Sequence, residues 1–167
     1  MVQQRAETMD GGLYDSDFLT WTQQQAAALR RLSERADNFG LDLVNLVEEV
    51  ETLGRAELAR VQGALFRLLE HAALVALAGP GHRDVPHWRG EMVAFRWPAA
   101  KNFRPSMRQH LEPELASLWH AARQAATRKF GRDPDALPEA LPFTLDQLLR
   151  DLPLDDLPPM LAPPAGP

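Results

Sequence analysis

The largest group of side chains that could carry chemistry is a set of four acids, Glu48, Glu49, Glu51 and Glu57. Paired carboxylates can bind a divalent cation or act as general acid and general base. Helical bundles that bind two metal ions use Glu-x-x-His pairs on two helices, and this sequence contains no Glu-x-x-His. We therefore interpret the acids as a solvated helix face, on which Glu51 and Arg55 form a pair four residues apart. A carboxylate- or metal-dependent enzyme centred on the Glu48–Glu57 region is the third of our hypotheses.

The other residue types that support catalysis are scattered along the chain. The five histidines have neither His-x-x-x-His nor H-E-x-x-H spacing. The absence of cysteine excludes disulfides, thiolate zinc sites and cysteine nucleophiles. No Gly-x-Ser-x-Gly motif is present. We predict no catalytic, cofactor-binding or metal-binding residues. Enzymatic activity stays open, with a non-enzymatic role favoured.

One acid, Glu57, falls on an apolar stripe. Steps of seven residues from Leu43 reach Val50 and then Glu57, and positions seven apart share a helix face. A buried carboxylate requires a partner that compensates for its lost hydration. We expect a buried ion pair between Glu57 and Arg89 or Arg96.

Charge is strongly segmented along the chain. Residues 81–132 hold 10 basic and 4 acidic side chains, whereas residues 133–167 hold 1 basic and 7 acidic ones. In a compact helical domain, such segments can form ion pairs with each other, and we favour this interpretation. The alternative is a nucleic-acid-associated protein, because cations interleaved with aromatic rings suit such partners. Its cations would be Arg89, Arg96, Lys101, Arg104 and Arg108.

The elements that must position these residues are helices. Asp15 or Ser16 can cap a first helix that runs to about Leu32, and residues 33–40 form a turn. A long helix is predicted over residues 42–78. Steps of seven from Val47 reach Gly54 and then further apolar residues, so the apolar stripe keeps its phase through the glycine. We interpret Gly54 as a packing notch in one continuous helix.

Further helices follow in the second half of the chain. One is predicted from Pro86 until Pro98 stops it. Another begins at Ser106, and Pro113 either kinks it or starts the next helix. A last helix covers residues 144–152, where Thr144 and Gln147 have the spacing of a capping box. No run shows the alternation of a strand. The fold class is therefore all-α, a helical bundle of about five helices.

Domain organisation follows from composition. We predict a disordered N-terminus over residues 1–13, a single all-helical domain over residues 14–150 and a Pro-rich acidic tail over residues 151–167, which we expect to be unfolded. The N-terminus lacks the apolar segment of a signal peptide. No run approaches the roughly 18 apolar residues of a membrane span. We expect a cytoplasmic protein without membrane contact.

Several stretches occur together in an order that resembles a known family. These are "LYDSDFLTWTQQQAAALR", "DLVNLVEEVETLGRAEL", "HWRGEMVAFR" and "LPEALPFTLDQLL". The sequence resembles the bacterial family known as domain of unknown function twenty-nine, from about Leu13 to Leu149. The resemblance implies an all-helical domain and a bacterial origin, and it implies no activity. The sequence departs from the family where Trp97-Pro98 interrupts an arginine-rich helix and where Phe143 replaces tryptophan.

We favour a helical protein-interaction or regulatory domain without catalytic activity or cofactors. Long amphipathic helices are suited to contact with a partner. The partner is an unidentified protein, with a homo-oligomer as one form of it, and nucleic acid is not favoured. The candidate functional surface comprises Glu48, Glu51, Arg55, Trp88, Arg89 and Arg96.

Overall fold

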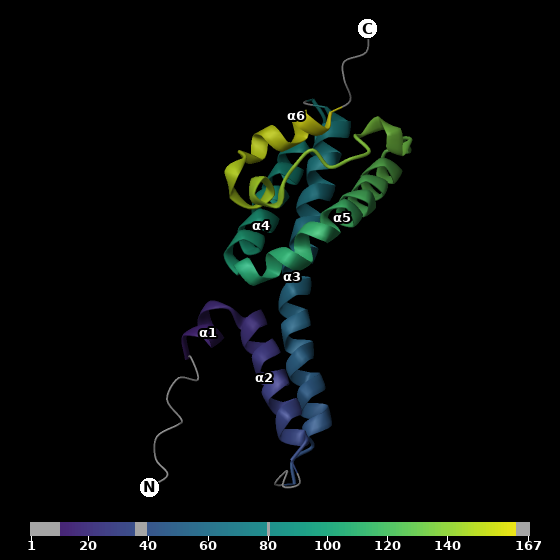
Figure 1. The fold of residues 1–167 in the computed structure, drawn as a ribbon. Helices are drawn as coiled ribbons and strands as arrows, with labels where there is room; N and C mark the ends of the chain where they lie inside the picture. The colour runs from purple at the N-terminus through teal and green to yellow at the C-terminus, as the bar shows by residue number, and fades with distance from the viewer. Residues whose placement is uncertain (1–10, 36–39, 80, 163–167) are drawn as a thin grey trace. The chain divides into compact units, whose positions relative to one another are not determined.

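A computed structural model describes residues 11–35, 40–79 and 81–162 of the chain (Figure 1). In these ranges the chain forms helices and turns and no strand, so the predicted all-α class is confirmed. The main helices are α1 (Gly11–Ser16), α2 (Phe18–Ser33), α3 (Leu43–Ala78), α4 (Val85–Asn102), α5 (Arg108–Lys129) and α6 (Leu157–Leu161). Short helical turns are η1 (Pro105–Met107), η2 (Pro134–Ala136), η3 (Gln147–Asp151) and η4 (Leu154–Asp156).

The predicted single domain is divided into two compact units. Unit 1 comprises residues 1–59 and 104–107, and unit 2 comprises residues 60–103 and 108–167. Helix α3 contributes its first part to unit 1 and its second part to unit 2. This helix is continuous through Gly54, as the phase of the apolar stripe predicts.

Unit 1 is organised around α2 and the first part of α3. Asp17 caps α2, because its Oδ1 accepts a hydrogen bond from the Thr20 amide at 3.1 Å. The same oxygen accepts a hydrogen bond from the Ser106 hydroxyl at 2.8 Å, which ties η1 to the start of α2. The predicted cap, Asp15 or Ser16, was wrong: both belong to the separate helix α1. Residues 11–13 are helical too, and residues 1–10 lie outside the described part.

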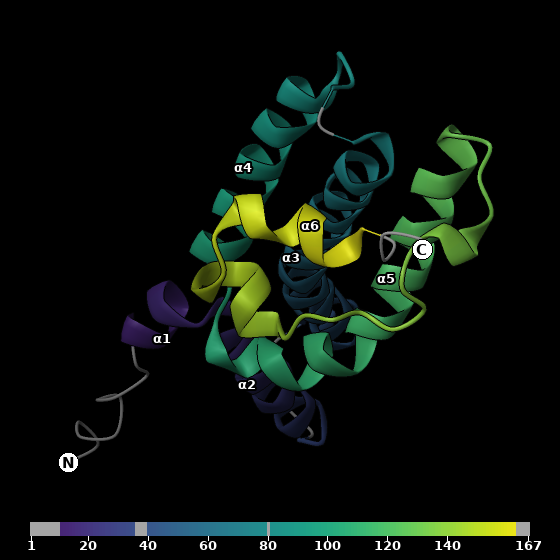
Figure 2. The same cartoon turned by 90° about the horizontal axis from the view of Figure 1, so that it is seen from above.

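Unit 2 is built on the second part of α3, with α4 and α5 on either side of it (Figure 2). Apolar residues recur on several faces of this part of α3 and are buried there, while Gly63 and Arg67 remain exposed. Helix α5 contributes Trp119 and Leu111, and α4 contributes Met92, each almost fully buried. The fully buried α3 residues are Val61, Leu65, Leu68, Leu69, Ala72 and Ala73.

Two prolines lie inside helices that the sequence predicts to end or kink there. Helix α4 continues through Pro98, and α5 continues through Pro113. A proline removes the hydrogen bond to the carbonyl four residues earlier. Those carbonyls belong to Ala94 and Gln109, both exposed residues, so water can take the vacant position. The prediction that Pro98 stops the helix was wrong, because the hydrogen bond that it removes is on the solvent-exposed side of the helix, where water can replace it.

The C-terminal segment also differs from the prediction of an unfolded tail over residues 151–167. It is folded as far as Leu161, because η4 and α6 follow η3. Leu157, Pro158 and Leu161 are buried in unit 2. The predicted capping box precedes them: the Thr144 amide donates to Gln147 Oε1 at 2.9 Å, and the Gln147 amide donates to Thr144 Oγ1 at 3.3 Å.

Helix α3 is long and apolar enough to cross a membrane by length and composition. The sequence argument, which found no run of that kind, did not anticipate this. Half of the apolar window of α3 is buried inside the structure. The core helix of a water-soluble protein has the same properties, so the finding carries no further conclusion.

Candidate functional site

The hairpin of α2 and residues 43–59 of α3 is held together at Gly54. A Cβ atom at Gly54 would overlap the Thr22 hydroxyl oxygen and stand 3.4 Å from Leu19 Cδ1. Thr22 is itself buried, and its hydroxyl donates to the Leu19 carbonyl at 2.8 Å. The glycine therefore lets the two helices approach closely, which confirms its interpretation as a notch.

One side of the hairpin is polar. Arg30 of α2 forms an ion pair with Glu51 of α3. Arg55 Nη2 donates to Thr52 Oγ1 at 2.6 Å. The predicted pair between Glu51 and Arg55 was therefore wrong, because each side chain has found another partner. A hollow of about 180 Å³ lies beside the ion pair and is lined by Leu19, Thr22, Gln23, Glu51, Gly54 and Arg55.

The hairpin also leaves apolar residues uncovered. On α3, Leu46 is 40% exposed and Leu53 is 51% exposed, with the half-buried Val50 between them. At about 100° per residue, these three share one stripe of the helix, turned roughly 65° from Leu43 and Gly54, which are buried. On α2, Trp21 and Leu32 form a second half-buried stripe, separate from the buried Leu19, Thr22 and Ala26.

The two stripes lie on the same side of the hairpin. Antiparallel neighbours are related by a local two-fold axis, so equal senses of rotation about each helix lead to the same side. Each residue turns the helix by about 100°. On both helices, the apolar stripe lies on the side reached by rotating about the helix axis against this sense from the buried contact. Arg30 and Glu51 lie on the side reached by rotating with it. The Arg30–Glu51 ion pair confirms that rotations in this sense meet on one side. The opposite side of the hairpin is called the apolar side, and it comprises Trp21, Leu32, Leu46, Val50 and Leu53.

Aromatic side chains extend the apolar side toward α1. Tyr14 contacts Phe18 and Trp21 edge-on, with ring centroids 5.4 Å and 4.9 Å apart. Phe18 and Trp21 are stacked with centroids 5.5 Å apart. Tyr14 remains 52% exposed, and the other two rings are half-buried. Edge-on and offset pairs are favourable ring geometries, so this cluster is an ordered surface rather than loose side chains.

The acids that suggested an enzyme are exposed or half-buried. Glu48 is exposed, and Glu57 is half-buried rather than buried, so the premise of a buried carboxylate is not met. Within the part of the chain that the structure describes, no group of three or more His, Asp or Glu side chains could hold a metal ion. Glu57 belongs to unit 1, whereas Arg89 and Arg96 belong to unit 2.

The basic segment forms ion pairs with the acidic segment that follows it. Arg89 pairs with Asp155, and Arg123 Nη2 lies 3.0 Å from Asp135 Oδ1. The two Nη atoms of Arg108 contact the carboxylate of Asp146 at 2.6 and 3.0 Å. Three basic residues of this segment therefore pair with acids from residues 133–167, which confirms the prediction of internal pairing.

These contacts shift the pKa of the groups that form them. The hydrogen bond from Arg108 lowers the pKa of the Asp146 carboxyl. The hydrogen bond to Asp146 raises the pKa of Arg108, and one to Glu112 adds to it. All three groups are exposed to solvent, where such pairs contribute little to stability.

Arg96 holds the C-terminal segment through three backbone carbonyls. Its Nε donates to the Leu149 carbonyl at 3.0 Å, and its two Nη atoms donate to those of Leu152 at 2.6 Å and Gln147 at 3.3 Å. The Gln147 carbonyl also accepts a hydrogen bond from the amide of Leu152, the residue after η3, so Arg96 adds to the contacts that close this turn. Burial lowers the pKa of Arg96, and Asp151 opposes that shift. Arg96 is thus a structural clamp rather than a surface cation.

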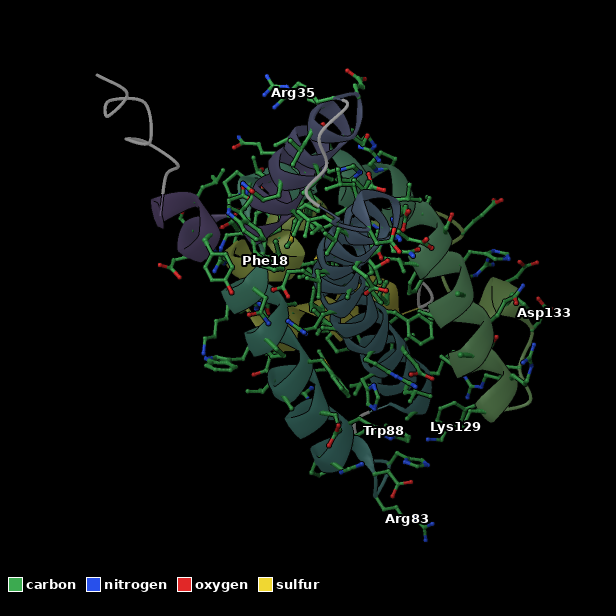
Figure 3. All side chains as sticks on the ribbon, turned by 90° about the horizontal axis from the view of Figure 1, so that it is seen from below. Phe18, Arg35, Arg83, Trp88, Lys129 and Asp133 are labelled. Atoms are coloured by element: carbon green, nitrogen blue, oxygen red, sulfur yellow. The ribbon has the colours of Figure 1, made fainter. Side chains whose placement is uncertain are left out.

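Trp88 is a core residue of unit 2. It is 3% exposed and packs against His82 and Phe130, with ring centroids 5.2 and 5.9 Å away. Lys129 Nζ lies 5.0 Å from the centre of its ring, and Figure 3 shows the two side chains close together. The predicted functional surface therefore includes Trp88, which is buried, besides Arg96, which is half-buried and binds backbone carbonyls.

The sequence argument missed the apolar side of the hairpin. It assigned no surface role to the apolar residues of α2, of which Trp21 and Leu32 are half-buried, while Thr22 occupies the contact with α3. The signal was the width of the apolar face on α3. Two stripes, one through Leu43 and Gly54 and one through Leu46 and Leu53, exceed what a single neighbouring helix covers.

Comparison with known proteins gives relatives that are helical and of unknown function. The family described as "Domain of unknown function DUF29" matches residues 13–152. The crystal structure of an alpha-helical protein of unknown function from Rhodospirillum rubrum is similar, with 29% sequence identity and a TM-score of 0.78. The alignment covers 90% of this chain and 98% of that one. No curated protein matched the sequence. The matches agree with the family resemblance and with the all-α class.

Proposed function

The chain belongs to the DUF29 family, whose function is unknown, and we propose that it acts as a protein-interaction module. Its contact surface is the apolar side of the hairpin. One observation carries the proposal: helix geometry places the stripe of α3 that holds the exposed Leu46 and Leu53 on the same side as the half-buried stripe of α2. Contiguous exposed apolar surface rimmed by polar residues is typical of sites that bind other proteins. Leu46 and Leu53 are the exposed centre of this surface on α3.

The alternative of nucleic-acid binding has less support in the geometry. Of the five cations that it would use, Arg89 and Arg108 pair with acids, and Arg96 binds backbone carbonyls. Lys101 Nζ lies over the Trp97 ring at 4.6 Å. Phosphate binding would have to displace most of these contacts. If it occurs, affinity for DNA or RNA falls steeply with salt, and a titration by fluorescence anisotropy at two salt concentrations measures this.

The interaction proposal is tested by capture from an extract of the native host. The bait is the full chain or its double variant Leu46→Glu with Leu53→Glu, which places charges in the apolar side. The control is Val44→Glu, because Val44 is 76% exposed and helix geometry puts it on the polar side of the same helix. We expect specific partners with the wild type and the control and their loss with the double variant. Equal recovery with all three baits would exclude this surface.

A further inference from the structure

We draw no further inference here: the strongest candidate, the apolar patch on the exposed face of α4 where Val93 and Trp97 are 58% and 64% exposed, carries nothing, because nothing in the structure shows what covers it.

Discussion

The two parts of helix α3 differ in their surroundings. In unit 2, the part after residue 60 buries residues on several faces, including Leu68 and Leu69, and leaves Gly63 and Arg67 exposed. In unit 1, the part before residue 60 buries Leu43 and Gly54 and leaves Leu46 and Leu53 exposed. The helices that pack around each part within its own unit account for this difference.

Charge differs between the units in the same way. Unit 2 joins its basic and acidic segments through ion pairs, and Arg96 binds three backbone carbonyls of the C-terminal segment. Unit 1 has an ion pair on the polar side of the hairpin, while Leu46 and Leu53 stand exposed on α3. Unit 2 thus joins its charged segments internally, whereas unit 1 presents apolar side chains in an arrangement suited to a partner.

The strongest test of this contrast compares two leucines of α3. Leu68→Ala removes a fully buried side chain of unit 2 and should lower the free energy of unfolding by about 2–5 kcal/mol. Leu53→Ala removes a side chain that is half exposed. At protein concentrations where the chain is monomeric, Leu53→Ala should change the free energy of unfolding by no more than about 0.5 kcal/mol. Urea unfolding followed by circular dichroism measures both. Equal losses would show that the two parts of α3 are packed alike.

The second-largest expected loss of stability concerns Arg96, the residue that holds the C-terminal segment of unit 2. Arg96→Ala removes three hydrogen bonds from a charged donor and should cost about 1.5–3 kcal/mol. Amide exchange should rise first in the segment that it holds, residues 147–161. Arg89→Ala is the matched control, because it removes an exposed ion pair with Asp155 that is worth about 0–1 kcal/mol. Unchanged exchange in Arg96→Ala would contradict the role of this residue as a clamp.

Two glycines of α3 should respond with opposite signs. Gly54→Ala brings a methyl group against Thr22, and overpacking of this kind costs about 1–3 kcal/mol, which exceeds the gain of about 1 kcal/mol in helix propensity. Gly63→Ala meets no atom within 4 Å and should stabilise by up to about 1 kcal/mol. Thermal unfolding measures the difference. Adding Thr22→Ala to Gly54→Ala should recover part of the loss. Stabilisation by both alanines would show that the notch is not needed.

The smallest effect is a pH dependence at the surface of unit 2. The pKa of Asp146 is lowered in the folded chain by Arg108, so the pair stabilises the fold above the ordinary pKa of 3.8. This contribution is lost as the pH falls through the folded value. Asp146→Asn should therefore be slightly less stable than the wild type at neutral pH and equal to it in acid. High salt should shrink the difference at neutral pH. A difference that grows in acid would contradict this assignment.

Local signals allowed much of the helical structure to be predicted. The capping box at Thr144 and Gln147 forms as its spacing indicates, because both partners lie within one turn. The phase of apolar residues through Gly54 identified one long helix and a notch. The complementary charges of residues 81–132 and 133–167 indicated internal ion pairs, although which residues pair could not be read from the sequence.

Predictions failed where a contact between distant residues decides the outcome. Composition marks residues 151–167 as unfolded, yet Leu157 and Leu161 are buried, and Arg96 holds the preceding turn. Pro98 is a helix breaker by local rules, yet α4 continues through it. The pairing of Glu57 with Arg89 or Arg96 stays a prediction, because Glu57 belongs to one compact unit and both arginines belong to the other.

The sequence by itself determined the all-α class, the family, the continuity of α3 and the role of Gly54, because these depend on periodicity and on interactions within a few turns. The tertiary structure decided which apolar stripe of each helix is covered, which acid each arginine meets and where the chain divides into two units. An amphipathic pattern specifies that a face will be buried, but the neighbour that buries it comes from elsewhere in the chain. In unit 1 the neighbours cover one stripe of α3 and leave Leu46 and Leu53 exposed.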